Sequence, residues 1–144
     1  GLYDNIFGIA LVYAGVNLPM SFMVIKGYMD TIPLELLESA QIDGATSGQA
    51  FRRIILPVSK PGIVTACVFL VINSWNELLF ANLLNQSDSS RTIQVAIRSF
   101  LTTFDANYAY AFAAMVISIL PTIIIYALLT DKIIGGMTAG AVKG

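Results

Sequence analysis

Histidine, cysteine and charged residues are scarce in this sequence of 144 residues. It contains no His and a single Cys, while Asp, Glu, Lys and Arg together make up 12% of it. The lone Cys67 excludes an internal disulfide, and without histidine there is no metal-binding cluster, so Cys67 is expected to be a packing residue. A net charge of −1 without a run of basic residues also argues against nucleic-acid binding.

Hydrophobic residues dominate instead. They make up 56% of the sequence, and its mean hydropathy is +0.75, outside the range usual for soluble domains. Residues 5–25, 61–84 and 106–130 form stretches long enough to cross a hydrocarbon core, which requires roughly 20 apolar residues. The sequence therefore predicts an all-α, polytopic membrane helix bundle with three transmembrane helices. The chain begins at Gly1 without a Met or a basic segment, so we expect no signal peptide and a piece of a longer protein.

Basic residues are distributed unevenly between the two sides of this three-span arrangement. Arg91 and Arg98 fall on one side. The other side has Lys26, Arg52, Arg53, Lys60, Lys132 and Lys143. Because basic residues are concentrated in cytoplasmic loops, residues 26–60 and the tail 131–144 are expected on the cytoplasmic side of the membrane. The loop 85–105 is expected outside.

Residues 31–57, which we call the elbow, are predicted to form two short helices joined at Gly44. In the first helix, residues 31–44, Pro33 lies in the first turn and the acidic Glu35 and Glu38 lie near the positive end of the helix dipole. Gly44 is the expected stop. The helical wheel predicts a buried face formed by Leu34, Leu36, Leu37 and Ala40.

The second helix of the elbow is expected to begin with a capping box at Thr46 and Gln49 and to end at Pro57. Amphipathicity by itself leaves two interpretations open. The elbow is either an interfacial segment that lies on lipid headgroups or a contact surface for another protein.

The spacing of residues within the elbow favours the second interpretation. Glu38, Ser39 and Ala40 are followed by Gly44 and then, after residues 45–53, by Ile54, Leu56 and Pro57. This pattern resembles the EAA motif of the permease subunits of bacterial ABC importers, and only Ser39, where the motif has Ala, departs from it. The runs IDGA at 42–45, WNE at 75–77 and TAGAVKG at 138–144 resemble the carbohydrate branch, close to the second permease of maltose-type systems. The resemblance covers the whole chain but only the last three of the usual six spans, so a C-terminal part is expected.

The resemblance implies that the elbow is a coupling helix seated in a cleft of a separate ATP-hydrolysing subunit. It implies that Glu38 pairs with a basic group there, that Gly44 permits the turn, and that Ser39 and Ala40 allow close packing. It assigns Ile54, Leu56 and Pro57 to docking of the second helix. The tail residues Thr138, Gly140 and Lys143 are implied to contact the ATPase as well. The implied partners are a pair of ATPase subunits, a sister permease and an extracytoplasmic solute-binding protein.

The chain itself is not expected to be an enzyme or to bind a cofactor. It lacks a phosphate-binding GxxxxGK[ST] loop, so ATP would be bound and hydrolysed by the partner.

Polar residues cluster near the end of the second span, at Asn73, Trp75, Asn76 and Glu77. Ionisable residues within a span usually face a bundle interior or an aqueous path. Two interpretations remain open: Trp75 and Glu77 anchor the helix at the membrane interface, or the cluster lines the translocation pathway or its gate.

Together these features predict the permease subunit of an ATP-driven sugar importer. One alternative is an ABC permease for another solute, such as glycerol phosphate or a polyamine. A secondary transporter or a membrane anchor is less consistent with the sequence, because the former favours more buried acids and the latter needs no elbow.

Overall fold

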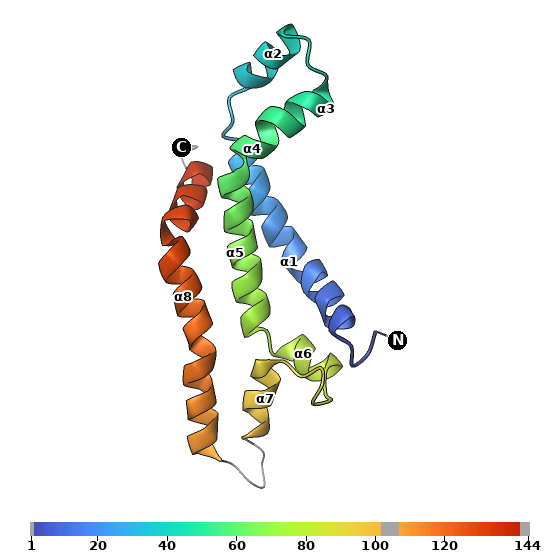
Figure 1. The fold of residues 1–144 in the computed structure, drawn as a ribbon, viewed down its shortest axis with the longest axis vertical. Helices are drawn as coiled ribbons and strands as arrows, with labels where there is room; N and C mark the ends of the chain where they lie inside the picture. The colour runs from blue at the N-terminus through green and yellow to red at the C-terminus, as the bar shows by residue number, and fades with distance from the viewer. Residues whose placement is uncertain (1, 102–106, 142–144) are drawn as a thin grey trace. The chain divides into compact units, whose positions relative to one another are not determined.

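The computed structural model describes residues 2–101 and 107–141, with side chains up to Thr130, and all elements in these ranges are helices. They are α1 (Ile6–Met29), α2 (Glu35–Ile42), α3 (Ser47–Ala50), the π-helix η1 (Phe51–Ile55), α4 (Leu56–Val58), α5 (Lys60–Asn76), α6 (Leu79–Leu84), α7 (Ile93–Ser99) and α8 (Tyr108–Ala141) (Figure 1). The predicted all-α fold class is confirmed.

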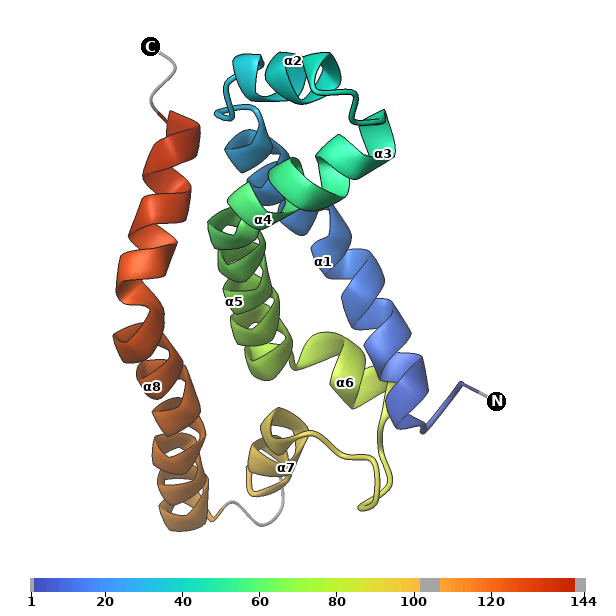
Figure 2. The same cartoon turned by 45° about the horizontal axis from the view of Figure 1, so that its top comes forward.

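The chain divides into two compact units. The first comprises residues 1–18 and 71–128, and the second comprises residues 19–70 and 129–144. The first unit therefore holds the start of α1, the end of α5, α6, α7 and most of α8. The second holds the end of α1, the elbow, most of α5 and the end of α8, and these elements can be followed in Figure 2.

Two helices of the described residues are long and apolar enough to cross a membrane. They are Ile6–Met29 and Tyr108–Thr130, and a third span is reached if the bent pair Ser47–Val58 and Lys60–Asn76 counts as one. Large apolar side chains on these helices are exposed, with 62% of Phe22 and 75% of Leu128 accessible. Helices with apolar surfaces of this extent are suited to lipid or to further helices rather than to water.

The second expected span, 61–84, is interrupted. Helix α5 ends at Asn76 and α6 begins at Leu79. The break is stabilised by Glu77, whose carboxylate accepts hydrogen bonds from the amides of Phe80 at 2.8 Å and Ala81 at 3.0 Å. Because the acidic side chain satisfies amides that lie at a helix start, the chain can begin a new helix here. With 17 residues, α5 by itself is about 25 Å long.

The core of the first unit lies where α6 and α7 meet the beginning of α1. Ile9, Ala81 and Val95 are buried there, and Tyr13, Phe80 and Leu84 pack against them. The fully buried Asn85 donates to the carbonyl of Ser90 at 3.3 Å. The connection at 85–105, which was expected as a loop, thus contains the helix α7, in which Val95 and Ile97 are buried.

In the second unit, α1 and α5 approach closely at Gly62. A Cβ atom on Gly62 would lie 2.5 Å from the Cβ of Tyr28, so only glycine fits without a backbone shift. Small residues at such positions allow helices in membranes to pack closely.

We predict that Gly62→Ala lowers the stability of the helix pair by about 1–3 kcal/mol, because the added methyl group overpacks the contact with Tyr28. The matched control is Gly27→Ala, because a Cβ at Gly27 meets nothing within 4 Å and alanine is the better helix former. Thermal unfolding in detergent should show a lower Tm for the first variant and an equal or higher Tm for the second. Equal shifts would contradict the close contact.

Candidate functional site

The first elbow helix, α2, ends in a turn that requires glycine. Gly44 has φ +78°, in the left-handed region. The amide of Ala45 donates to the carbonyl of Ala40 at 2.9 Å, and the amide of Gly44 donates to that of Gln41 at 3.0 Å. These two bonds are those of a Schellman motif, so the structure confirms Gly44 as the stop of the helix.

The apolar side of α2 is only partly buried. Ala40 is 6% exposed, whereas Leu34 is 70% and Leu36 is 40% exposed. The expectation of a buried face formed by all four apolar residues is therefore wrong, because the side chains of Leu34 and Leu36 remain exposed among the described residues. Pro33 also precedes the helix instead of lying in its first turn, since α2 begins at Glu35.

The second helix of the elbow starts as predicted. The hydroxyl of Thr46 accepts from the amide of Gln49, and the side chain of Gln49 accepts from the amide of Thr46 at 2.9 Å, which completes the capping box. Ala50 is buried, and α3 contacts α2. The two helices of the elbow are therefore each capped and packed against each other.

The second helix does not end at Pro57 as expected. It passes through Pro57 to Val58, with a π-helical segment at Phe51–Ile55 before it. Proline lacks an amide hydrogen and crowds the carbonyl four residues earlier, and a π-turn accommodates this by shifting the hydrogen-bond pattern. The chain then bends by 64° into α5.

Ser59, which is fully buried, forms the bend between the elbow and α5. Its amide and its hydroxyl both donate to the carbonyl of Ile55, at 2.8 and 2.7 Å. Its own carbonyl accepts from the amide of Ile63 at 3.0 Å and so begins α5. Ser59 gave no signal in the sequence, because its hydroxyl bonds back to the preceding helix instead of capping the start of α5.

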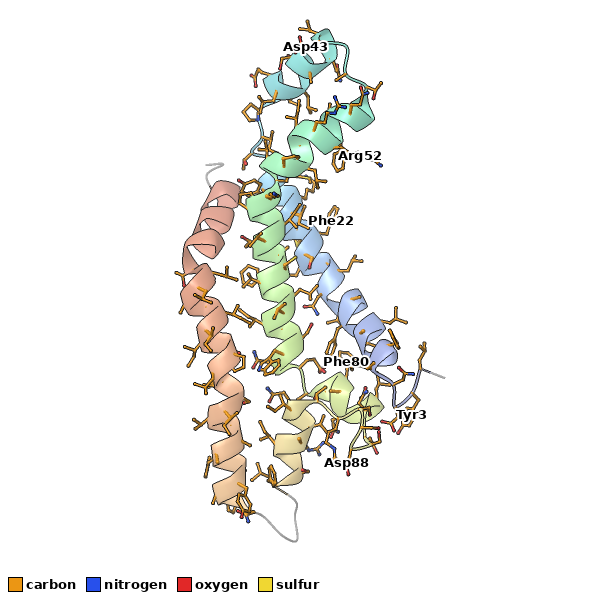
Figure 3. All side chains as sticks on the ribbon, viewed as in Figure 1. Tyr3, Phe22, Asp43, Arg52, Phe80 and Asp88 are labelled. Atoms are coloured by element: carbon orange, nitrogen blue, oxygen red, sulfur yellow. The ribbon has the colours of Figure 1, made fainter. Side chains whose placement is uncertain are left out.

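The residues of the motif in the elbow differ in how exposed they are. Glu38, Ser39, Leu56 and Pro57 are exposed, Ile54 is half-buried, and Ala40 is buried. Arg52 extends away from the elbow and Asp43 lies at the end of α2 (Figure 3).

A groove of about 640 Å³ lies between the two helices of the elbow and the end of α1. Its lining is mainly apolar and consists of Met29, Asp30, Ile32, Leu34, Leu37, Gln41, Ser47, Phe51 and Ile55.

The polar cluster near the end of α5 makes contacts between helices. The side-chain amide of Asn73 donates to the side-chain oxygen of Asn17 on α1 at 3.3 Å. The side-chain amide of Asn17 in turn donates to the hydroxyl of Ser74 at 3.5 Å and to the backbone carbonyl of Tyr13 at 2.8 Å. Asn17 is 7% exposed. Because such groups find no partner in hydrocarbon, they tie α1 to α5.

Trp75 joins α5 to α8. Its indole N–H donates to the backbone carbonyl of Ser118 at 2.9 Å, and its own carbonyl accepts from the side chain of Gln94 on α7 at 3.2 Å. Asn76 is exposed, and within the described part of the chain its side-chain amide donates only to the carbonyl of Ile72 in its own helix, at 2.8 Å. The structure thus brings Asn73, Trp75 and Glu77 into packing contacts and leaves Asn76 outside them. The sequence did not predict that Asn17 would bond Asn73, or that Gln94 and Ser118 would bond Trp75. These three partners differ from other residues of the chain only in being polar residues near apolar ones.

The three tail residues predicted to contact the ATPase lie at or beyond the end of the described residues. The backbone of α8 continues through Thr138 and Gly140, but the side chain of Thr138 and the whole of Lys143 lie outside the described residues.

Comparison with known proteins identifies the family. The model for "Binding-protein-dependent transport system inner membrane component" matches residues 1–137. The chain belongs to this family. Together with the apolar helices, membership makes it a membrane protein.

Individual relatives agree with this assignment. The chain is 36% identical over 143 residues to the diacetylchitobiose uptake system permease protein DasC of Streptomyces coelicolor, covering 99% of this chain and 52% of DasC. It is 36% identical over 146 residues to the trehalose transport system permease protein SugB of Mycobacterium tuberculosis, covering 100% of this chain and 53% of SugB. The chain spans about half the length of the curated relatives it matches.

A solved structure has the same fold. A crystal structure of a bacterial ABC transporter involved in the import of the acidic polysaccharide alginate matches with a TM-score of 0.71 and 26% identity, over 91% of this chain and 51% of that chain.

We predict that Glu77→Ala lowers the Tm of the detergent-extracted protein, with a loss of about 1–3 kcal/mol, because two amides at the start of α6 lose their acceptor. Glu77→Gln retains an acceptor oxygen and should lose less. Asn76→Ala is the matched control, because Asn76 is exposed and bonds only within α5. A Glu77→Ala protein as stable as Asn76→Ala would show that Glu77 does not cap α6.

Proposed function

We propose that this chain is part of the permease subunit of an ATP-driven, binding-protein-dependent sugar importer. The observation that carries the proposal is the match of residues 1–137 to a family described as binding-protein-dependent transport components. The relatives named for diacetylchitobiose and for trehalose transport favour a carbohydrate over glycerol phosphate or a polyamine.

The elbow is the proposed site of coupling to a partner that hydrolyses ATP. Four features of residues 35–59 support this role: a glycine turn at Gly44, a capping box at Thr46, mutual contact of the two helices, and a buried Ser59 at the bend into α5. A segment that is capped and packed in this way can pass a displacement to α5, whereas an unstructured loop would absorb it. The exposed Glu38, Leu56 and Pro57 are the residues available to a partner surface.

The remaining assignments follow from the same proposal. The elbow and the tail 131–144 face the cytoplasm, with Thr138, Gly140 and Lys143 directed to the ATPase pair. A sister permease completes the pathway, and a solute-binding protein delivers the sugar from outside. We propose that Asn73, Trp75 and Glu77 support the pathway by fixing the positions of α1, α8 and α6, since their polar atoms bond those helices.

We predict that Glu38→Lys uncouples sugar uptake from ATP hydrolysis and lowers uptake by at least tenfold while the protein remains in the membrane. The reason is that charge reversal places like charges together at the proposed contact with a basic group. Glu35→Lys is the matched control, since Glu35 is also exposed in the first turn of α2 but lies outside the motif. Uptake and ATPase rates measured in proteoliposomes distinguish the two, and equal losses in both variants would contradict a specific role for Glu38.

The class of solute is tested by uptake of a labelled panel containing disaccharides, glycerol phosphate and a polyamine. We expect uptake of a disaccharide that requires both ATP and the binding protein. Uptake of the polyamine or of glycerol phosphate alone would overturn the assignment to carbohydrate.

A further inference from the structure

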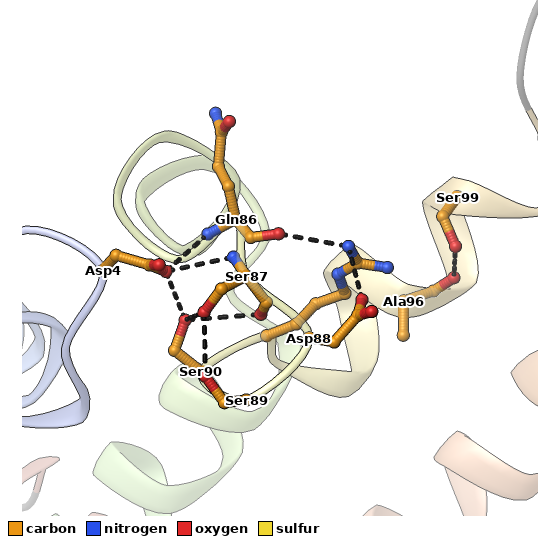
Figure 4. Close-up of polar contacts among 9 residues, drawn as sticks. Asp4, Gln86, Ser87, Asp88, Ser89, Ser90, Ala96 and Ser99 are labelled. Atoms are coloured by element: carbon orange, nitrogen blue, oxygen red, sulfur yellow. Dashed lines mark hydrogen bonds and ion pairs between the residues drawn. The ribbon is translucent and has the colours of Figure 1, made fainter.

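The segment before α1 is bonded to the connection between α6 and α7. One carboxylate oxygen of Asp4 accepts hydrogen bonds from the amide of Gln86 at 3.0 Å, from the amide of Ser87 at 3.1 Å and from the hydroxyl of Ser90 (Figure 4). The amide of Asp4 donates to the carbonyl of Leu84 at 2.8 Å. We call this set of bonds the Asp4 clamp.

Two backbone features hold Asp4 in place. Asp4 has φ 53°, in the left-handed region, where Asp and Asn are tolerated better than most residues. The segment can also cross the first turn of α1 only because residue 8 is glycine: a Cβ on Gly8 would lie 1.8 Å from the carbonyl oxygen of Leu2.

The clamped connection has internal order of its own. The amides of Ser90 and Arg91 donate to the carbonyl of Ser87 at 3.1 and 3.0 Å, which forms a tight turn. The guanidinium of Arg91 contacts Asp88 at 2.9 Å and donates to the carbonyl of Gln86 at 3.1 Å. The tip of this turn remains open, since 92% of the Asp88 side chain is accessible.

The charge of Asp4 is stabilised by the same bonds. The hydroxyl of Ser90, followed by the amide and hydroxyl of Ser87, lowers the pKa of Asp4 to about 2. The carboxylate is therefore an ionised acceptor at neutral pH, and hydrogen bonds to an ionised group are stronger than those between neutral groups.

We propose that Asp4 is a positioning residue that fixes residues 86–91 as the surface on which a soluble binding protein docks. This inference rests on the proposed function, because the family description makes transport dependent on such a protein. Residue 4 precedes the first turn of α1 and the elbow follows its last turn, so an expected membrane span separates the two along the chain. The binding protein then meets a turn that is already ordered, and the entropy cost of docking is reduced.

The clamp itself is tested by hydrogen exchange in the assembled transporter. Asp4→Gly deletes the carboxylate but still permits the positive φ, and Asp4→Asn keeps both an acceptor and the positive φ. We expect exchange of the amides of residues 86–91 to accelerate about tenfold in Asp4→Gly and less in Asp4→Asn. Asp88→Asn, which removes a carboxylate from the same turn without touching the clamp, is the control and should leave Gln86 and Ser87 protected.

Docking is tested by uptake at increasing concentrations of the binding protein. We expect Asp4→Gly to raise the KM for the binding protein about fivefold with little change in maximal rate, and Asp88→Asn to raise it less. Unchanged exchange in Asp4→Gly would overturn the clamp. Faster exchange with an unchanged KM would overturn its role in docking. If uptake by the unaltered transporter needs no binding protein, the proposed function fails, and the exchange experiment still decides whether the clamp exists.

Discussion

Backbone amides and carbonyls that are left free where a helix ends must find partners, and a break that lies in hydrocarbon must find them within the protein, because lipid supplies none. The described residues meet this requirement with a different side chain or backbone device at each break. Gly44 closes α2 through two backbone bonds, Ser59 satisfies the carbonyl of Ile55 twice, and Glu77 caps the amides of α6. Asp4 does the same for the amides of Gln86 and Ser87.

The functional consequence is that these four connections, like the helices, have specific hydrogen-bond partners. In the elbow, a left-handed glycine and a capping box end one helix and begin the next within a few residues, and the buried Ser59 sets the 64° bend into α5. Such a segment has few internal degrees of freedom, so it moves as a unit and passes a displacement on to α5. This mechanical property is what a subunit needs if its energy comes from a separate protein.

The sequence predicted those elements whose signals are local. The stop at Gly44, the capping box at Thr46 and the apolar lengths of α1 and α8 depend on residues within a few positions of each other. The break at Glu77 was missed because the apolar run from α5 to α6 continues through it, and hydropathy does not register that an acidic side chain can cap the following turn. The exposure of Leu34 and Leu36 was missed for a related reason: a helical wheel shows which face is apolar, but not whether this chain supplies anything to cover it.

The polar cluster illustrates the same limit at longer range. Asn73 and Trp75 were recognised as unusual in a span, but the sequence could not identify Asn17 and Ser118 as their partners, which lie on other helices. These bonds explain how polar residues can be retained in an apolar environment.

The central claim, that the elbow engages a separate ATP-hydrolysing subunit, is tested most directly by placing a photo-crosslinking amino acid at position 38 in the transporter of native membranes. The same probe at position 7, exposed on the first turn of α1, serves as the reference. The account predicts that position 38 yields a crosslink to an ATPase subunit, that the yield changes when ATP is bound, and that position 7 yields none. Crosslinks from position 38 to lipid alone, in membranes that take up sugar at the normal rate, would contradict it.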